Sequence, residues 1–254
     1  MVLIRIKIMT DKIIQAQVED ISPLTDSIVR LVLMPDEYVD YQAGQYLQIL
    51  FANDAFSYSI ANDAFSYSIA NAPLGSHRYE LHIRHSQDND YHQSLLAHIK
   101  QYGSLRLRLP LGECSIDQLH PQKPILFIAG GTGFAPIKAM IEQLLADSDS
   151  RPFELFWGAR SQSDLYMDEK VRSWRSHASH FQYFSLLSDK SEDTLASRVL
   201  ARHANILRDW QIVISGPFDM VYSTRDTLVG YGISPTQMFS DAFSFESKTD
   251  DAKN

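Results

Sequence analysis

The chain has 254 residues, of which 44% are hydrophobic and 21% are charged, as in an ordinary globular protein. This length exceeds the usual size of one domain, so we expect two domains of roughly 100 to 150 residues each, and the alternative at this point is one larger domain. The net charge of −8 argues against a nucleic-acid-binding surface, which would need clustered Lys and Arg.

The apolar segments and the cysteine content narrow the class of protein further. The longest apolar runs, 124–129 and 211–215, are far shorter than the roughly 20 residues that span a bilayer, so we expect no transmembrane helix. Residues 1–12 alternate apolar and basic side chains and do not resemble a signal peptide, which predicts a cytoplasmic location. Cys114 is the only cysteine, which excludes an internal disulfide and an all-cysteine iron–sulfur cluster. We interpret Cys114 as a small buried residue, and no metal site is predicted.

The first half of the chain consists of short β-like runs separated by Pro and Gly, which predicts a barrel or a sandwich. The predicted strands are 13–21, 27–33, 45–51, 79–85 and 104–109. Residues 91–101 carry apolar side chains at helical spacing, with Gly103 just after them. This pattern predicts one helix that caps the barrel.

The second half alternates strand-like and helix-like segments. The predicted strands are 125–129, 153–158, 181–187, 211–215 and 237–243, and the predicted helices are 136–145, 165–176, 197–203 and 219–229. This alternation predicts a doubly wound α/β domain, in which helices cover both faces of a parallel sheet. We expect domains at 1–120 and 121–246, followed by a disordered polar tail at 247–254.

Two strand–turn–helix motifs carry the chemical signal of the second half. GGTGFAP (130–136) follows a buried strand and has Pro136 in the first turn of the next helix. A helix N-terminus favours anions, and glycines let a pyrophosphate approach it closely, so this motif predicts a dinucleotide or phosphate site. The alternative is a tight turn without a ligand. SGPFDM (215–220) is a weaker motif that can face the same ligand, because the strand ends of such a sheet share one crevice.

These two motifs, together with FWGAR (156–160) and Tyr166, resemble the ferredoxin–NADP reductase superfamily, and most closely its NAD(P)H:flavin oxidoreductase branch. That branch includes the bacterial flavin reductases that supply luciferase. The resemblance runs from residue 16 to residue 245 through AGQY (43–46), YSIA (67–70), YELHI (79–83), LGE (111–113) and DAFSF (241–245). It implies an antiparallel six-stranded β-barrel that binds a flavin, followed by a domain that binds NADH or NADPH, with the flavin ring between them.

The resemblance also implies a role for individual residues near the flavin. In this superfamily an aromatic-Ser pair lies against the flavin, and the Ser hydroxyl reaches N5, the atom that receives the hydride. A donor there stabilises developing charge, so Ser68 is the candidate catalytic residue. The implied flavin-binding residues are Phe65, Ser66, Tyr67, Ser68, Ile69, Ala70, His82, Ile83 and Phe243.

A tandem duplication creates a rival for Ser68. Residues 52–62 (ANDAFSYSIAN) are identical to residues 61–71, an offset of nine, so Ser59 occupies the equivalent place in the first copy. An odd offset turns the side chains of a strand to the opposite face unless a loop absorbs it. The spacing from Ser68 to Glu80 matches the flavin reductases, whereas the spacing from Gly44 to Ser59 nearly matches them on the upstream side. Because the strand after the second copy pairs without adjustment, we favour Ser68 and expect 53–63 to form a mobile excursion.

The implied nucleotide-binding residues lie in the second half. They are Gly130, Gly131, Thr132, Gly133, Phe134, Pro136, Arg160, Gly216, Pro217 and Met220. For Arg160, a contact with the adenosine and a solvated surface charge are both open.

The sequence departs from the superfamily pattern at two places. Phe65 stands where an arginine usually grips the flavin phosphate or ribityl chain, so we expect a flavin that enters and leaves. If the flavin phosphate proves important, Arg84 is the first other cation to test. Ser215 stands where many reductases place a cysteine beside the nicotinamide, which excludes thiol chemistry at that position.

The sequence therefore predicts an NAD(P)H:flavin oxidoreductase that transfers a hydride from NADH or NADPH to loosely bound or free riboflavin, FMN or FAD. Two alternatives are an FAD-containing reductase that passes electrons to a separate protein, and a non-catalytic flavin or nucleotide sensor. The expected partners are these small molecules and a flavin-consuming enzyme such as a monooxygenase or luciferase, and neither nucleic acid nor a membrane is expected. The nucleotide preference, the preferred flavin, the final electron acceptor and the oligomeric state stay open.

Overall fold

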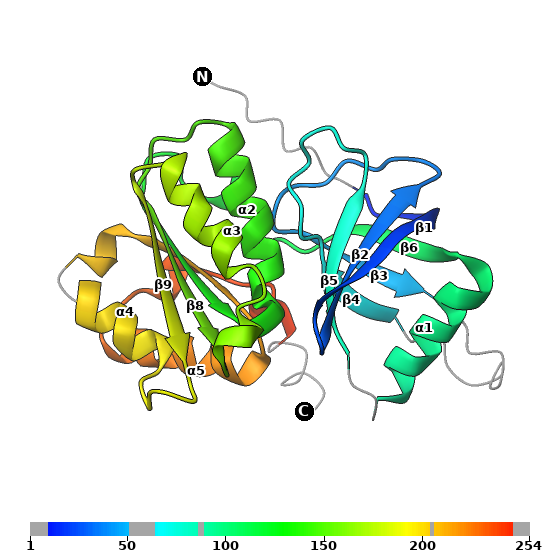
Figure 1. Ribbon diagram of the computed structural model, residues 1–254. Coiled ribbons are helices and arrows are strands. Elements are labelled where there is room, and N and C mark those ends of the chain that lie inside the picture. Colours follow the sequence, from blue (N-terminus) through cyan, green and yellow to red (C-terminus); the bar gives the residue numbers. More distant parts are fainter. Residues whose placement is uncertain (1–9, 51–63, 86–88, 204–205, 246–254) are drawn as a thin grey trace, which may run out of the picture.

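The computed structural model describes residues 10–50, 64–85, 89–203 and 206–245. They form an antiparallel β-barrel and an α/β domain that lie side by side (Figure 1). The predicted fold class is thereby confirmed. None of the helices in this part of the chain is both long and apolar enough to cross a membrane.

The barrel is one six-stranded sheet with the order β4-β3-β6-β1-β2-β5. Its strands are β1 (Lys12–Thr25), β2 (Ile28–Pro35), β3 (Tyr46–Leu50), β4 (Ala64–Ser68), β5 (Tyr79–Arg84) and β6 (Ser104–Leu111). A β-bridge between Ile69 and Leu81 joins the two outer strands and closes the barrel. The enclosed side chains are mainly Leu, Ile and Tyr, as expected for strands with one buried face.

β4 is the strand that local sequence patterns did not predict. It belongs to the second copy of the duplication and pairs with β3, so that Ser68 lies opposite Tyr46. The first copy, with Phe56 and Ser59, lies outside the described residues, as do the excursion predicted at 53–63 and the tail predicted at 247–254.

The helix α1 (Asp90–Tyr102) covers one end of the barrel (Figure 1). The Asn89 side chain accepts hydrogen bonds from the first N–H groups of the helix, and Gly103, with φ +65°, ends it in a left-handed conformation. Both are common helix-end signals. Leu95 and Ile99 are buried against the barrel core, so the helical spacing in the sequence predicted this element correctly.

The α/β domain has a parallel five-stranded sheet with the order β11-β10-β7-β8-β9. Its strands are β7 (Ile125–Gly130), β8 (Phe153–Ala159), β9 (Phe181–Leu187), β10 (Gln211–Ser215) and β11 (Met238–Phe239). Its helices are α2 (Phe134–Ala146), α3 (Asp168–Ser173), α4 (Leu195–His203) and α5 (Phe218–Gly230).

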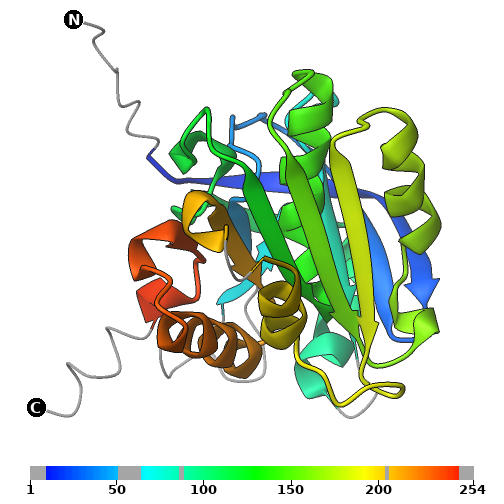
Figure 2. The ribbon, with the colours of Figure 1, turned by 90° about the vertical axis from the view of Figure 1, so that its left-hand side faces the viewer.

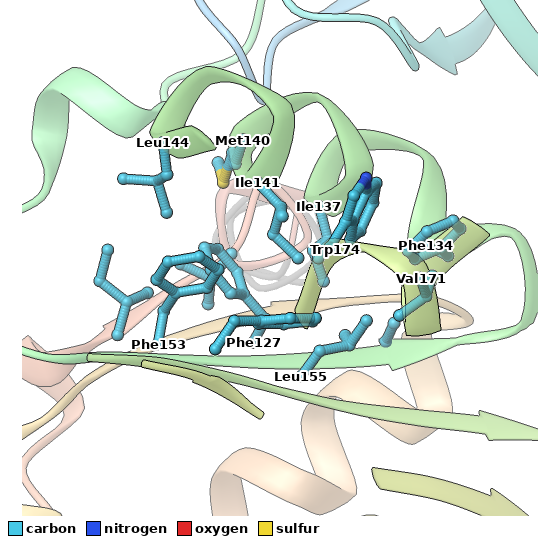
Figure 3. Close-up of a cluster of buried hydrophobic side chains, with 14 of the residues drawn as sticks. Phe127, Phe134, Ile137, Met140, Ile141, Leu144, Phe153, Leu155, Val171 and Trp174 are labelled. Carbon is cyan, nitrogen blue, oxygen red and sulfur yellow. The ribbon is translucent and has the colours of Figure 1, made fainter. Parts of the chain in front are cut away.

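Helices cover both faces of this sheet (Figures 1 and 2). Successive residues of β7 are buried in different cores, since Phe127 packs with α2 and α3 whereas Ile128 packs with α4 and α5. Figure 3 shows the first of these cores, in which Phe127, Ile137 and Trp174 meet. A strand that is buried on both sides reads as a continuous apolar run, which is why the sequence predicted it.

Two predicted elements are shorter in the structure. The helix expected at 165–176 is reduced to α3, and a single 3₁₀ turn follows it at Trp174–Ser176. The strand expected at 237–243 ends at Phe239; after it, the Ser240 side chain accepts a hydrogen bond from the Ala242 N–H and Asp241 accepts one from the Glu113 N–H.

Candidate active site

The two domains enclose a cleft whose larger lobe has a volume of about 950 Å³. Its walls come from β4 and β5 and from the segments that follow β7, β8 and β10. From β7, the sheet extends to one side through β8 and to the other through β10. Open α/β sheets bind ligands at such a switch in strand order, beyond the carboxyl ends of the strands.

The glycine-rich turn, residues 130–133, forms one wall of the larger lobe. Gly131 has φ +53°, and a Cβ added there would meet only Arg84 Nη1, at 3.9 Å, among the described residues. Trp157 Nε1 fixes the turn by donating a hydrogen bond to Gly131 O at 3.0 Å. Because α2 begins directly after the turn, its N-terminal N–H groups and dipole favour an anion here.

The turn after β10 packs directly against the glycine-rich turn. A Cβ added to Gly133 would lie 2.2 Å from the Ser215 carbonyl oxygen, and one added to Gly216 would lie 3.1 Å from Gly130 Cα. Only glycine permits such an approach of two backbones. The two turns therefore border one space.

On the barrel side, Ser66 and Ser68 of β4 line the cleft. Tyr67 also borders the larger lobe, but its ring packs against the barrel core. Phe65 stacks on Tyr91 of α1. The alternation of a strand thus presents both serines to one side.

A second lobe of about 390 Å³ adjoins the first. Four residues border both lobes, namely Ser66, Ser68, Ser215 and Gly216. The predicted catalytic serine and the turn after β10 therefore lie where the lobes meet.

Burial raises the pKa values of three titratable side chains that line the second lobe, namely Tyr46, Cys114 and Asp241. Asp241 accepts hydrogen bonds from the N–H groups of Glu113 at 2.9 Å and Cys114 at 3.0 Å, but burial outweighs them and raises the pKa of its carboxyl. Burial, with the Asp241 charge, also raises the pKa of the Cys114 thiol. A thiol that stays protonated is a poor nucleophile, which agrees with a packing role for Cys114.

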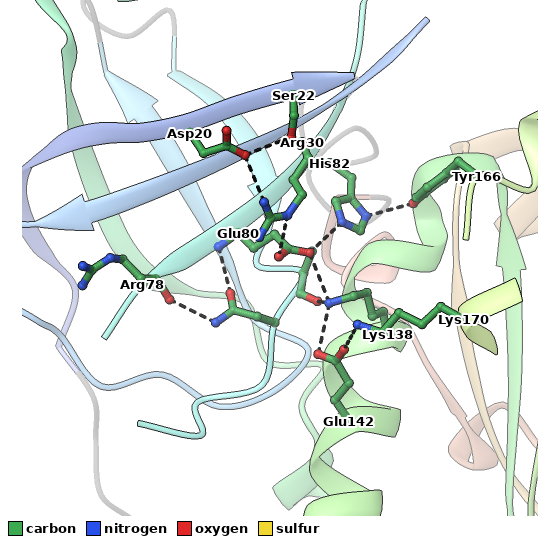
Figure 4. A network of polar contacts seen from close by, with 12 residues as sticks. Asp20, Ser22, Arg30, Arg78, Glu80, His82, Lys138, Glu142, Tyr166 and Lys170 are labelled. Carbon is green, nitrogen blue, oxygen red and sulfur yellow. Dashed lines mark hydrogen bonds and ion pairs between the residues drawn. The ribbon is translucent and has the colours of Figure 1, made fainter. Parts of the chain in front are cut away.

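His82 lines the larger lobe and links the two domains (Figure 4). Its Nε2 lies 3.0 Å from Glu80 Oε1, and its Nδ1 lies 3.0 Å from the Tyr166 hydroxyl. Burial lowers the pKa of His82, so the ring is neutral at neutral pH. An ionised carboxylate only accepts, so Nε2 donates to Glu80 and the Tyr166 hydroxyl donates to Nδ1.

Most residues predicted for the site line the cleft. These are Ser66, Tyr67, Ser68, His82, Gly130, Gly131, Thr132, Gly133, Pro136, Arg160, Gly216, Pro217 and Met220. The described residues that do not line it are Phe65, Ile69, Ala70, Ile83, Phe134 and Phe243.

These exceptions have packing reasons. Phe134 is fully buried and stacks on Trp157, with ring centroids 4.0 Å apart. Ile69 and Ile83 belong to the barrel core, and Phe243 packs against the core beside α5. A segment that matches a superfamily motif contains such packing residues as well as residues that face the ligand.

Several residues that line the cleft were not singled out from the sequence. They include Tyr46, Asp164, Asp193, Phe218, Asp241 and Phe245. Tyr46, Asp241 and Phe245 lie in segments that carried the resemblance, so the resemblance could have identified them as site residues. Asp193 has no motif around it, and only the fold places it at the cleft.

Comparisons with known proteins show what the chain is similar to. Residues 127–226 match the model of the oxidoreductase NAD-binding domain family. The chain is 30% identical over 224 residues to the CDP-6-deoxy-L-threo-D-glycero-4-hexulose-3-dehydrase reductase of Yersinia pestis, covering 85% of this chain and 64% of that protein. It is 28% identical over 243 residues to the NAD(P)H-flavin reductase of Aliivibrio fischeri, covering 91% and 99%. The Amycolatopsis cytochrome P450 reductase shares the fold with a TM-score of 0.77 and 22% identity, covering 92% and 70%.

The family match and the fold together indicate an NAD-binding domain of the oxidoreductase type at 127–226, beside a β-barrel. The chain is similar to NAD(P)H-flavin reductases, and it has the fold of a ferredoxin NADP+ reductase from Neisseria gonorrhoeae, with a TM-score of 0.71 and 14% identity. It spans slightly less than two thirds of the Yersinia relative, 64%, and nearly all of the Aliivibrio relative, 99%.

Proposed function

We propose that the chain transfers a hydride from NADH or NADPH to a flavin in the cleft. One observation carries this proposal: Ser68 of the barrel and Ser215 and Gly216 of the α/β domain border the same two lobes. NAD(P)H supplies the hydride and the flavin accepts it, so the protein's work is to bind, align and hydrogen-bond them.

The residues present fit a nucleotide and a flavin. Gly131 leaves open the space that a Cβ would fill, next to the N-terminus of α2, as a pyrophosphate requires. The lobes of about 950 and 390 Å³ together exceed the volume of about 300 to 1,000 Å³ that is usual for one ligand pocket. Two ligands can therefore occupy the cleft together.

Different residues of the chain bind the nucleotide and the flavin. The glycine-rich turn binds the pyrophosphate, and Arg160, at the rim, contacts the adenosine portion. The Ser68 hydroxyl donates a hydrogen bond at the flavin N5 and stabilises the charge that develops there. Hydride transfer needs no general base, which agrees with a neutral His82 held between two partners.

We further propose that the flavin is a substrate that enters and leaves. Phe65 cannot bind a phosphate, and among the described residues Arg84 is the only cation that the barrel contributes to the lining of the larger lobe. Its Nη2 lies 4.0 Å from Asp164 Oδ1, so part of its charge is already balanced. A flavin phosphate therefore adds little to binding.

Spectroscopy of the desalted protein tests this function. We expect a colourless protein that oxidises NADH or NADPH only when riboflavin, FMN or FAD is added. A yellow protein would instead support a permanently bound FAD and electron transfer to a separate protein; the Yersinia relative is named as the reductase of a dehydrase. Failure to oxidise either nucleotide with any flavin would leave a non-catalytic sensor.

The consumer of the reduced flavin follows from the same proposal. A freely diffusing reduced flavin suits a separate oxygen-using enzyme, such as a monooxygenase or a luciferase. A cytoplasmic location remains a prediction from the sequence.

A further inference from the structure

Lys138 is a charged side chain at the domain boundary that the proposed function does not use. It lies on α2, one turn after the start of the helix, and its side chain is only 2% exposed. A lone ammonium group is costly to bury, so its partners must compensate for the lost water.

Two of those partners belong to the barrel. Lys138 Nζ donates to the Ala70 carbonyl oxygen at 2.8 Å and lies 3.2 Å from Glu80 Oε1. Its third partner, Glu142 Oε2 at 3.0 Å, is on α2 itself. Figure 4 shows Lys138 reaching from its helix toward the barrel strand that carries Glu80 and His82.

Glu80 is the centre of the network on the barrel side. Burial opposes its charge, but the hydrogen bond from His82 and the charges of Lys138 and Arg30 outweigh burial and hold the pKa of Glu80 well below its usual value. Arg30 Nε binds Glu80 Oε2 at 2.9 Å, so each carboxylate oxygen has a partner. The side chain is therefore an ionised anchor that the barrel itself orients.

The two ends of this network lead to the two ligand-binding segments. Ala70 lies two residues after Ser68, and its N–H donates to the Glu80 carbonyl at 2.7 Å. At the other end, Lys138 lies on the helix that begins at the glycine-rich turn. Neither Lys138 nor Glu80 is among the residues that line the larger lobe.

We propose that Lys138 and Glu80 form a clamp between the domains, which fixes the nucleotide-binding turn relative to Ser68. Lys138 is a positioning residue, and the proposal rests on the proposed hydride transfer for its kinetic consequence. Hydride transfer requires the nicotinamide and the flavin N5 in near contact, and an error of about 1 Å in alignment can cost about 100-fold in rate.

The chain offers a matched control for Lys138. Lys170 Nζ also binds Glu142, at 2.7 Å from Oε1, but its side chain is 45% exposed and it forms no ion pair with the described residues of the barrel. Lys138→Met and Lys170→Met therefore each remove an ammonium group that pairs with Glu142. Only Lys138→Met also removes the contacts with the barrel. In Lys138→Met, Glu80 keeps Arg30 and Glu142 keeps Lys170, so neither carboxylate is left without a cation.

Stopped-flow reduction of added flavin by NADH measures the kinetic effect. We expect Lys138→Met to slow hydride transfer ten-fold or more while the KM values for NADH and flavin change less than three-fold. The primary deuterium isotope effect should increase, because a longer transfer distance penalises the heavier isotope more. Lys138→Arg should recover most of the rate, and Lys170→Met should match the wild type.

Hydrogen–deuterium exchange provides a readout that does not need turnover. Peptides covering 69–82 should exchange faster in Lys138→Met than in the wild type and in Lys170→Met. If the wild type reduces no flavin, the proposed function is wrong, and exchange alone then decides whether the clamp exists. Equal exchange in both variants, or a lower Tm of Lys138→Met with unchanged transfer rate and isotope effect, would overturn the clamp as a positioning device.

Discussion

The two sides of the cleft achieve their geometry by different physical means. On the α/β side, backbone meets backbone, and a Cβ on Gly133 would stand 2.2 Å from the Ser215 oxygen. On the barrel side, Ser68 lies on a strand of five residues, next to the segment that Lys138 and Glu80 hold by charge. Steric exclusion requires glycine, so it can be recognised in the sequence as a glycine-rich motif. A charge network uses common charged residues, and their role depends on partners that are distant in the sequence.

Gly133→Ala should disrupt the close packing of the two turns and cause the largest loss of stability. The added Cβ meets backbone atoms of Ser215 and Gly216 that cannot move without disturbing β10. Overpacking of this kind costs about 1 to 3 kcal/mol or more, and each kcal/mol lowers the Tm of a chain of this size by roughly 2 to 4 °C.

Gly131→Ala is the matched variant in the same turn. Among the described residues its Cβ would approach only Arg84, at 3.9 Å, so the cost is mainly that of a left-handed backbone, about 1 to 2 kcal/mol. We expect a folded protein with a raised KM for NAD(P)H and near-normal flavin binding. Thermal unfolding and steady-state kinetics compare the two, and equal Tm values for both variants would contradict the steric account.

Ser68→Ala tests the chemistry on the barrel side and should have the next largest effect. Loss of a donor aimed at developing charge should slow hydride transfer by roughly ten-fold or more, with little change in folding. Ser59→Ala, in the first copy of the duplication, should be nearly silent in the same assay. The reverse pattern would assign the site to the first copy.

The flavin phosphate should have a smaller effect. Since Phe65 replaces a charged anchor, kcat/KM values for riboflavin, FMN and FAD should lie within a few-fold of one another. A charge-assisted contact is worth about 1.5 to 3 kcal/mol, which would appear as a preference of ten-fold or more. If FMN or FAD is preferred that strongly, Arg84→Ala should abolish the preference, and its persistence would require another cation.

A separate prediction, on stability and not on kinetics, concerns pH and the charge network. The folded-state pKa of Glu80 is depressed below its ordinary value of 4.5, so its ionisation stabilises the fold above that pH and this stabilisation is lost as the pH falls. Urea unfolding of the wild type and Glu80→Gln should therefore differ by a constant free energy from pH 8 to about pH 5.5, and by less in stronger acid. A difference that grows in acid would contradict an ionised Glu80.

The sequence predicted the α/β domain better than the barrel site. The difference between steric exclusion on the α/β side and a charge network on the barrel side explains why. The strand before the glycine-rich turn is apolar throughout, and the turn needs glycine, so both were visible in one segment. β4 was not visible because five residues with alternating Ser give a weak pattern, and only the superfamily resemblance pointed to it. Lys138, Glu80 and Tyr166 come from three separate segments, and only the fold brings them together.

An anaerobic single-turnover experiment tests the central claim most directly, namely that one cleft holds NAD(P)H and an exchangeable flavin in contact. Desalted protein, NADH deuterated at C4 and riboflavin would be mixed, and bleaching of the flavin absorbance followed. We predict bleaching that saturates with both ligands and shows a primary isotope effect. Absence of bleaching with riboflavin, FMN and FAD, with either nucleotide, would contradict the claim.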